Sequence, residues 1–464
     1  MKIRQLSKEE VVDFCTKEES HFFDRKDYRV SGEKVQKAVV AFANSDGGEL
    51  VIGIKDAKEE KNVDKRWAGK EKQEDFNSFL QVVTEISPSV PCSIEFLKSP
   101  DGIYVLRIIV EKSEAVHKVA DGTVYVRKSA QSLPVKDHDK IMQLSFSKGQ
   151  TSYEDTIVTS AAAEDIFESQ QMKNFLNDFS PKSDSIDFSL NQNLIDRKTY
   201  DPKVAGILLF SDNPVPLLPK RCGIKISRYD TSVDTPERVH LKEQHTVEGP
   251  LYEQIQNAAD RITETMESVQ IMGEKGLVKA KYPPETIWEI LVNAVIHRDY
   301  SISDDIHVLI FNNRIEIISP GKLPGYVTIN NILDSRFSRN SKLVRILNKY
   351  KNPPNKDMGE GLNTAFQRMQ DFKLKPPRIE ENNNVVKVII AHTPLASPEE
   401  TVMSYLKKEP SIKNRQAREI TGIKSENVMK GVFYSLRDSG LIEPVMSKSG
   451  NKIVAWKEAS EPVH

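Results

Sequence analysis

The chain has 464 residues and a mass of 52.6 kDa, with 38% hydrophobic and 29% charged residues, a composition typical of several soluble globular domains and not of a disordered chain. No apolar run approaches the roughly 20 residues that a membrane helix needs, and no secretory pattern follows the first charges, so we expect a cytoplasmic protein. The three cysteines form no C-x-x-C pair, which argues against structural zinc, and a net charge of −1 means that nucleic acid could be bound only by local patches.

Residues 1–145 predict a compact α+β unit. A helix at 31–44 is indicated by Val35, Val39 and Phe42 at helical spacing, and the turn SDGG ends it. The segment ELVIGI after that turn is predicted to be a nearly unbroken apolar strand. The other elements expected here are a short helix at 7–16, a strand with its turn at 19–29, a helix at 73–86, and strands at 103–112 and 122–129.

Three acidic residues and a lysine form a candidate catalytic site in this unit. Lys26 shares the side of Asp24 on an extended strand because side chains alternate, Glu19 lies five residues before Asp24, and Asp56 follows the apolar strand. Three converging carboxylates would suit Mg²⁺ or Mn²⁺, which would activate water, while Lys26 would stabilise negative charge at a scissile phosphate. The alternative is an ordinary solvated surface, since Asp, Glu and Lys are the commonest surface residues.

The pattern E-x4-[DE]-x-K and the phrases AFANSDGGELVIGIKD and VYVRKSAQSLP, within about residues 10–140, resemble the Schlafen AlbA-type domain, the divergent AAA DNA-binding domain of bacterial regulators. The resemblance implies nucleic-acid binding, and RNA cleavage as in animal Schlafen relatives, with catalytic roles for Glu19, Asp24 and Asp56. Two positions depart from the family: Asp24, where glutamate is usual, and Arg25, where an aromatic residue is common. Many bacterial members that only bind nucleic acid are the alternative.

Four other polar residues of this unit are assigned no fixed role. His21, beside Phe22, is interpreted as a packing residue rather than a catalytic base. Lys118, Arg127 and Lys128 are interpreted either as phosphate contacts or as the solvated edge of a strand.

Residues 146–249 are expected to form a connector and an accessory α/β region. Residues 150–200 are polar with weak periodicity, whereas VAGILLFSDNP and CGIKISRYD are predicted to be strands. Further along, residues 248–268 and 283–300 predict long helices, residues 304–325 a hairpin that turns at Asn312-Asn313, and residues 384–392 the closing strand.

The helix at 283–300 carries Glu289, Asn293 and His297 four residues apart, so all three project from one face. This could be the polar face of an amphipathic helix, but Asn is unfavourable in mid-helix, and its presence one turn after a glutamate is informative. Two glycine segments follow, ISPGKLPG after a strand and DMGEGLNTA before a helix. In the second, Gly359 and Gly361 would let the backbone approach a phosphate.

This order of segments, carried by NAVIHRDYS, NRIEIISPGKLP, SRNSKL and MGEGL, resembles the GHKL-type ATPase fold of gyrase, histidine kinase and MutL, and in particular its branch in RecG-like regulators. By this resemblance Asn293 would hold Mg²⁺ between the phosphates of ATP, and Glu289 would orient or deprotonate the attacking water. Gly321 would line the adenine pocket, and Gly359 and Gly361 would wrap the phosphates.

The same resemblance implies two further features of the nucleotide site. Ser319 stands where the usual fold has an aspartate that reads the adenine amino group, so this contact would be made without charge. Arg336, Arg339 and Asn340 fall in the segment where such folds carry a mobile lid over ATP, and Arg339 is a candidate nucleotide contact.

Residues 397–464 have the order of a winged helix–turn–helix, with Gly422 at the turn and SKSGNK at the tip of a hairpin. A winged helix used for dimerisation or docking is the alternative to one that binds nucleic acid. The positions spaced as its core are Ala417, Ile420, Ile423, Val428, Val432 and Leu436. The candidate contacts to a nucleic-acid backbone are Lys424, Lys430, Arg437 and Lys448.

We therefore expect an α+β multidomain protein with a Schlafen-like α+β domain (1–145), a connector (146–249), a GHKL-type α/β sandwich (250–396) and a winged helix (397–464). The first function hypothesis is an ATP-binding, nucleic-acid-processing enzyme, a metal-dependent nuclease controlled by its ATPase domain in antiviral defence. Its cofactors would be ATP and Mg²⁺ (or Mn²⁺), and it would form a homo-oligomer. The alternatives are an ATP-responsive DNA-binding transcription regulator without nuclease activity and a docking protein with a degenerate nucleotide fold.

Overall fold

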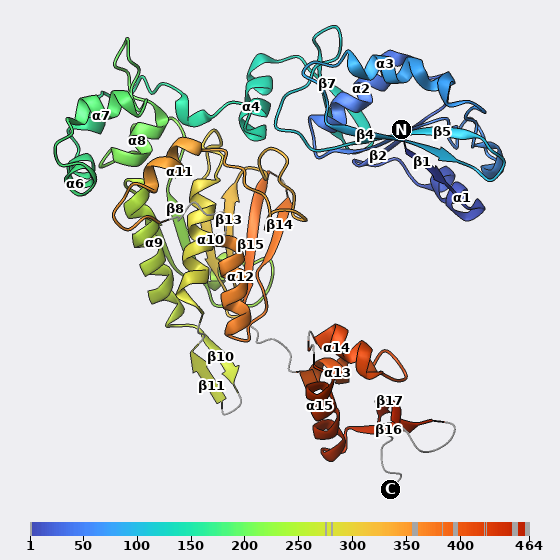
Figure 1. Ribbon diagram of the computed structural model, residues 1–464. Helices are drawn as coiled ribbons and strands as arrows, with labels where there is room; N and C mark the ends of the chain where they lie inside the picture. The colour runs from blue at the N-terminus through green and yellow to red at the C-terminus, as the bar shows by residue number, and fades with distance from the viewer. Residues whose placement is uncertain are drawn as a thin grey trace. The chain divides into compact units, whose positions relative to one another are not determined.

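Two compact units make up the chain: Met1–Phe372 with Pro376–His392, and Lys373–Lys375 with Thr393–His464. The computed structural model describes residues 2–273, 276–279, 282–354, 361–382, 384–392, 398–421, 423, 425–447 and 453–459. Within these ranges, no helix combines the length and the apolar character that crossing a membrane requires. The mixture of helices with several sheets confirms the predicted α+β class (Figure 1).

The first unit opens with a five-stranded sheet in the order β1-β4-β5-β3-β2. β1 pairs with β4 and β2 with β3 in parallel, and the two other pairs are antiparallel. The hairpin β6–β7 packs against α2. The strands are β1 (Lys2–Gln5), β2 (Phe23–Lys26), β3 (Gly48–Ile52), β4 (Cys92–Lys98), β5 (Tyr104–Val110), β6 (Val124–Lys128) and β7 (Gln131–Val135). The helices are α1 (Lys8–Thr16), η1 (Val63–Lys65), α2 (Gly32–Ala43), η2 (Gln73–Phe76) and α3 (Asn77–Thr84).

Both faces of this sheet are covered, because alternate residues of β3 enter two different cores. Leu50 and Ile52 pack with α2, η2 and α3, and Phe42 of α2 and Phe76 of η2 are fully buried in this core. Val51 packs on the opposite face with α1 and the chain around it. A strand buried on both sides needs an unbroken apolar run, which explains why ELVIGI has no polar alternation. The helix predicted at 31–44 and the strands predicted at 103–112 and 122–129 are confirmed.

A helical connector follows, and here one sequence prediction is wrong. Residues 204–214 were expected to be a strand, but α8 (Val204–Phe210) is a helix in which every residue is buried. A short apolar run does not distinguish a buried strand from a buried helix, so burial from all sides decided the outcome. The connector's other helices are α4 (His138–Lys148), η3 (Tyr153–Asp155), α5 (Glu164–Phe167), α6 (Gln170–Phe179) and α7 (Ser185–Asn191).

A six-stranded sheet in the order β14-β15-β13-β12-β8-β9 forms the rest of the first unit, and α9, α10 and α12 lie along one of its faces (Figure 1). The hairpin predicted to turn at Asn312-Asn313 is confirmed as β12 and β13. The strands are β8 (Ile224–Tyr229), β9 (Leu241–Val247), β12 (Ile306–Ile310), β13 (Arg314–Pro320), β14 (Arg378–Asn382) and β15 (Val385–Ala391), with a separate pair β10 (Gln270–Gly273) and β11 (Gly276–Lys279). The helices are η4 (Arg238–His240), α9 (Leu251–Met266), α10 (Pro284–Ile296), α11 (Ser341–Leu347) and α12 (Gly361–Asp371).

This sheet moves a predicted domain boundary. β8 and β9 lie before residue 250, yet β8 pairs in parallel with β12 and antiparallel with β9. A sheet and the helices that cover it share one core, so the domain that contains β12 and β13 begins before β8 and not at residue 250.

The second unit contains α13 (Pro398–Leu406), α14 (Asn414–Thr421), α15 (Glu426–Asp438) and the hairpin of β16 (Ile442–Met446) and β17 (Ile453–Glu458). The order of helices and hairpin is the predicted one, but two predicted core residues lie on the surface. Ile420 is 42% and Val428 57% exposed, whereas Met429 and Phe433 are fully buried and Phe433 stacks on Trp456. Val432 and Leu436 are buried as predicted, so the buried face of α15 differs from the predicted face in having Met429 and Phe433 and not Val428. Gly422, Lys424 and Lys448 lie outside the described residues.

Lys148, the last residue of α4, is a buried cation near the N-terminal domain. Its Nζ donates to Ala43 O at the end of α2, 2.8 Å away, and its own carbonyl accepts from Gly325 N. Burial, with a further contribution from the charge of Lys112, lowers the pKa of Lys148 to about 7. The fold therefore disfavours the protonated form of this lysine.

We expect this lysine to make the stability of the first unit rise with pH. Between about pH 7 and pH 10 the unfolded chain keeps a proton on Lys148 that the folded chain has released, so the free energy of unfolding increases through this window. Lys148→Met should flatten that rise, which amounts to on the order of a few kcal/mol in total. The lost hydrogen bond should in addition lower the free energy of unfolding of the variant by about 1 kcal/mol. Urea unfolding at a series of pH values measures the free energy of unfolding of the unmodified protein and of the Lys148→Met variant.

The matched control for this experiment is Lys140→Met, because Lys140 is exposed on the same helix. Its pH profile should coincide with that of the unmodified protein. An unchanged slope in Lys148→Met would contradict the predicted release of the proton on folding.

Candidate functional sites

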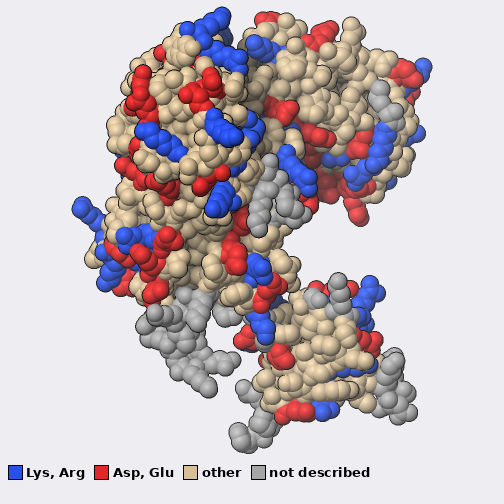
Figure 2. Space-filling model, turned by 60° about the vertical axis from the view of Figure 1, so that its left-hand side comes forward, with Lys and Arg blue, Asp and Glu red and all other residues tan. Residues whose placement is uncertain are grey.

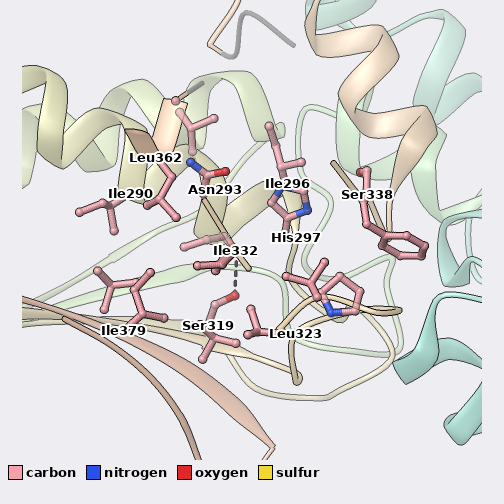
Figure 3. A pocket seen from close by; sticks show the side chains of 18 of the residues that line it. Ile290, Asn293, Ile296, His297, Ser319, Leu323, Ile332, Ser338, Leu362 and Ile379 are labelled. Atoms are coloured by element: carbon pink, nitrogen blue, oxygen red, sulfur yellow. Dashed lines mark hydrogen bonds between the residues drawn. The ribbon is translucent and has the colours of Figure 1, made fainter. Parts of the chain in front are cut away.

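A cavity of about 550 Å³ opens between α10 and the strands β13, β14 and β15 of the six-stranded sheet. Its volume falls in the range of sites that hold a nucleotide-sized ligand. Aliphatic side chains such as Ile290, Leu323 and Ile379 form much of its surface, with a few polar groups among them (Figure 3). The sequence-predicted residues among its lining are Glu289, Asn293, Ser319, Gly321, Arg336 and Gly361.

One end of the cavity is formed by the first turn of α12 against the polar stripe of α10. A Cβ on Gly361 would lie 3.1 Å from Glu289 Cδ and 3.7 Å from Asn293 Nδ2, and closer still to a carboxylate oxygen of Glu289, so the site has no room for a side chain. The Asn293 amide donates to Glu289 O, 2.7 Å away, which fixes the side chain one turn along the helix. The structure therefore brings together three residues that are predicted from two separate motifs. Gly359 lies outside the described residues.

His297 lies just beyond the last residue of α10, and its ring faces the cavity alongside Asn293 (Figure 3). Burial, with the nearby charge of Arg339, lowers its pKa to about 4, so the imidazole is neutral at pH 7. His297 Nδ1 and Ser338 Oγ have no hydrogen-bond partner among the described residues. Two buried polar atoms at a cavity wall are groups that a ligand can satisfy.

Ser319 and Gly321 form the opposite wall at the end of β13. The Ser319 hydroxyl donates to Ala294 O, 2.7 Å away, which uses its only proton and leaves its lone pairs to accept from a ligand (Figure 3). Gly321 has φ = +105°, and a Cβ there would lie 2.6 Å from Arg339 Nη1 and from Asp299 Cβ. Only glycine fits this turn.

Arg339 does not have the role predicted from the sequence. Its guanidinium is buried and donates to three carbonyls, His297 O at 3.2 Å, Ser147 O at 2.9 Å and Lys322 O at 2.7 Å. It therefore holds the cavity wall from behind instead of reaching a nucleotide. Asn340 is likewise buried, with its amide donating to two carbonyls that end α10, while Arg336 is the exposed arginine of this segment that lines the cavity.

A second polar site lies in the N-terminal domain on β2, where Asp24 and Lys26 project to the same side as predicted. Asp24 is buried and its Oδ2 accepts from Arg127 Nη1 at 2.8 Å, while the Lys26 ammonium contacts its other oxygen. Lys26 Nζ also lies 3.6 Å from Glu19 Oε1. Glu19, Asp24 and Lys26 therefore form one cluster, with Arg127 behind it.

The two carboxylates of this cluster are close enough to affect each other. Burial, and next the charge of Asp24, raise the pKa of Glu19 above its ordinary value, although Lys26 opposes the effect. The structure does not bring Asp56 into this cluster: its carboxylate accepts from Lys58 N in the turn after β3. In the described part of the chain, no three His, Cys, Asp or Glu side chains are grouped so as to hold a metal ion. Gly53 N and Ile54 N still donate to Lys26 O beside β2, and Asp56 begins the turn that follows, where its carbonyl accepts from Glu59 N and Glu60 N.

Two other N-terminal residues have contacts that the sequence did not indicate. Arg127 is a buried partner of Asp24 and of Ser20 O, so it is not a phosphate contact, whereas Lys118 and Lys128 are exposed. His21 packs edge-on against Phe22 but also binds Asp46, with Nε2 and Oδ2 2.8 Å apart. No spacing in the sequence links residues 24 and 127, which meet only when β6 folds over α2.

In the second unit, the described basic candidates have acidic neighbours. Lys430 Nζ lies 2.8 Å from Glu426, and Arg437 lies 2.7 Å from Asp438. Such exposed pairs contribute about 0–1 kcal/mol, so a phosphate could replace either acid.

Two family models match this chain. The Schlafen AlbA_2 model matches residues 19–136, which include Glu19, Asp24, Lys26 and Asp56. The model described as "Putative ATP-dependent DNA helicase recG C-terminal" (HATPase_c_4) matches residues 303–390. Glu289 and Asn293 lie before that second segment, and Gly361 within it lies against both of them.

No match was found among curated proteins. Among solved structures, the crystal structure of the DIP2311 protein from Corynebacterium diphtheriae is 18% identical in sequence, covers 95% of this chain and 92% of that chain, and has a TM-score of 0.41. The chain thus carries a Schlafen AlbA_2 domain and a RecG C-terminal, ATPase-type domain, and this combination supports an ATP-binding, nucleic-acid-associated protein.

Proposed function

We propose that the protein is an ATP-controlled nucleic-acid-processing enzyme, in which the cavity beside α10 binds ATP and the cluster on β2 acts on a nucleic acid. The observation that carries the proposal is the meeting of Glu289, Asn293 and Gly361 at one end of a cavity whose opposite wall is largely apolar and carries Ser319 and Lys322. An apolar slot with a polar end suits a flat base joined to a charged triphosphate.

The residues at the polar end fit a nucleotide-bound Mg²⁺. This ion usually takes only one or two protein oxygens and completes its shell with phosphates and water, so one amide oxygen from Asn293 is a sufficient protein ligand. The ion would neutralise phosphate charge. Glu289, held beside it on the same helix face, would orient or deprotonate the attacking water. Gly361 at the start of α12 would let backbone N–H groups approach the phosphates.

Ser319 would read the base. Because its hydroxyl proton is already donated to Ala294 O, it can only accept toward the cavity. An exocyclic amino group, as in adenine, satisfies that acceptor, whereas the carbonyl oxygen of guanine would face it lone pair to lone pair. The serine therefore preserves the polarity of the aspartate that it replaces, without its charge.

For the N-terminal cluster, we propose metal-dependent cleavage of a nucleic acid in antiviral defence. Glu19 and Asp24 can supply two oxygens to Mg²⁺ or Mn²⁺, whose role would be to lower the pKa of bound water and balance phosphate charge. The pKa of Glu19 is raised first by burial and next by the charge of Asp24, and a bound cation would favour the ionised carboxylate against both effects. Asp56, which the sequence adds to this set, would have to approach from its turn.

The surface favours local contacts over a broad basic track. On the face shown in Figure 2, acidic and basic residues are interspersed. Lys26, part-exposed between Glu19 and Asp24, is the cation placed to meet a phosphate. The alternative function, an ATP-responsive transcription regulator without nuclease activity, rests on the second unit, whose helices and hairpin have the order of a winged helix.

Asn293→Ala should weaken binding of ATP with Mg²⁺ by at least about tenfold, because the metal loses its protein oxygen. Isothermal titration calorimetry of the full chain measures the change. Asn257→Ala, an exposed mid-helix asparagine on α9, is the matched control and should bind as the unmodified protein does. If ATP gives no heat with the unmodified protein, the cavity is not a nucleotide site and a degenerate, docking fold is the better description.

Ser319→Ala should weaken ATP binding about three- to tenfold, the value of one neutral hydrogen bond, and leave GTP binding unchanged. The unmodified protein should prefer ATP to GTP by at least about tenfold, since a wrong base leaves a buried acceptor unsatisfied. Competition of the two nucleotides against a fluorescent ATP analogue tests both statements. Equal affinities for ATP and GTP would rule out base selection by Ser319.

Glu19→Gln should reduce cleavage of RNA or DNA by about a hundredfold or more while nucleic-acid binding persists, and it should change stability by less than about 0.5 kcal/mol because Glu19 lies at the edge of the cluster. Asp24→Asn is a poorer test of catalysis, since it leaves the buried Arg127 charge without its carboxylate and should destabilise the domain by about 3 kcal/mol. Cleavage is followed on gels with Mg²⁺ or Mn²⁺, with and without ATP, and stability by urea unfolding.

Substrate that stays intact under every metal and nucleotide condition would exclude the nuclease. A footprint at a defined DNA site in the same experiments would instead establish the regulator.

A further inference from the structure

A chain of polar contacts links the cavity wall to the loop that carries Glu19. Lys322, which follows Gly321 and lines the cavity, places its Nζ 3.0 Å from Asp46 Oδ2 and 3.3 Å from Oδ1. The same Oδ2 lies 2.8 Å from His21 Nε2. Asp46 belongs to the N-terminal domain, and its two partners lie at different candidate sites. Lys322 is in the wall of the cavity, and His21 is in the loop that carries Glu19.

Asp46 depends on both partners. Burial alone would raise its pKa, but the charge of Lys322 and hydrogen bonds from His21 and Lys322 outweigh burial and keep the pKa below its usual range. Its carboxylate is therefore ionised and shared between two cationic or donor groups. Removing either one changes the interaction left for the other.

His21 lies in the loop that positions Glu19. On one side, this loop is held by Arg127, whose Nη2 donates to Ser20 O at 2.9 Å. On the other side, it is held by the contact of His21 with Asp46. Glu19 is the residue next to Ser20, so its position relative to Asp24 depends on both attachments.

The cavity wall is fastened to the N-terminal domain at a second point. Lys112, two residues beyond β5, donates from Nζ to Leu323 O at 2.8 Å and to Val327 O at 3.0 Å. The loop 321–327 is therefore both a wall of the cavity and an attachment surface for the N-terminal domain. A ligand that shifts this loop acts on contacts that belong to both domains.

We propose that Asp46 is a positioning residue that transmits occupancy of the cavity to Glu19. This inference rests on the proposed binding of ATP. A base bound against Ser319 and Gly321 packs on the loop that carries Lys322, and the contact of Lys322 with Asp46 weakens as that loop adjusts. Asp46 then interacts mainly with His21, and the loop from Glu19 to Phe22 adjusts. ATP and nucleic acid thereby affect each other's affinity through one residue that contacts neither.

Amide hydrogen exchange of the full chain, with and without ATP and Mg²⁺, tests this proposal. In the unmodified protein, ATP should change exchange in residues 321–327 and also in residues 18–23, and it should change the affinity for a nucleic-acid probe by at least about fivefold. Asp46→Asn should keep the ATP response at 321–327 and lose it at 18–23. The ratio of its affinities for the nucleic-acid probe with and without ATP should be close to one. A merely structural role would alter both segments in the absence of ATP and leave the ratio unchanged.

Three further variants make the result specific. His21→Ala cuts the chain of contacts at its other end and serves if Asp46→Asn does not fold; it should uncouple the segments in the same way. Asp46→Glu restores the charge and should recover part of the coupling. Glu33→Gln breaks an exposed ion pair with Lys37 on α2 and should leave the coupling intact.

The outcomes separate this inference from the function on which it rests. If ATP gives no heat and no exchange response at 321–327, the nucleotide site fails and the coupling fails with it. If ATP binds and protects 321–327 but residues 18–23 do not respond, or respond equally in Asp46→Asn, the nucleotide site stands and the role of Asp46 is refuted.

Discussion

The buried guanidinium of Arg339 is the interaction on which the candidate cavity and its junction with the N-terminal domain both depend. It joins three segments that are distant in sequence, the end of α10 at His297, the loop after β13 at Lys322, and the end of α4 at Ser147. Burial lowers its pKa, and the carboxylates of Asp299 and Glu381 only partly offset this effect. Both Nη atoms donate to these carbonyls, whereas Nε has no partner among the described residues, so the loss of any of the three carbonyls would leave the buried charge poorly compensated.

The same arginine explains why a glycine begins the cavity wall. The space beside Gly321 is filled by Arg339 Nη1 and Asp299 Cβ, so the residue is glycine because of what lies behind the wall and not only because of a ligand in front of it. Ser319, two residues earlier, is fixed to Ala294 O of α10. Strand, loop and helix are thus tied together without any ligand, which is the preorganisation that a binding site needs to avoid ordering costs.

The sequence predicted what local spacing controls and missed what depends on long-range packing. The stripe of Glu289 and Asn293, the turn at Asn312-Asn313 and the shared side of Asp24 and Lys26 follow from helical and strand periodicity, and all three are present. The partnership of Asp24 with Arg127 joins residues 103 positions apart, and only the fold reveals it. The strand predicted over α8 and the core positions predicted at Ile420 and Val428 were wrong. An apolar residue indicates that its side chain tends to be buried, but it does not indicate whether the element is a strand or a helix, or which face of a helix is buried.

The charges of the N-terminal cluster set a condition on the chemistry proposed for it. Glu19 and Asp24 are balanced by Lys26 and Arg127, and Arg127 is too deeply buried to move. A divalent cation is attracted to two carboxylates only if one of the competing cations withdraws, and Lys26 is the one with room to do so. A phosphate of the nucleic acid is the natural new partner for its ammonium. Metal and nucleic acid would then bind together more tightly than either alone, and a cluster that is neutral at rest would become a metal site only with its substrate in place.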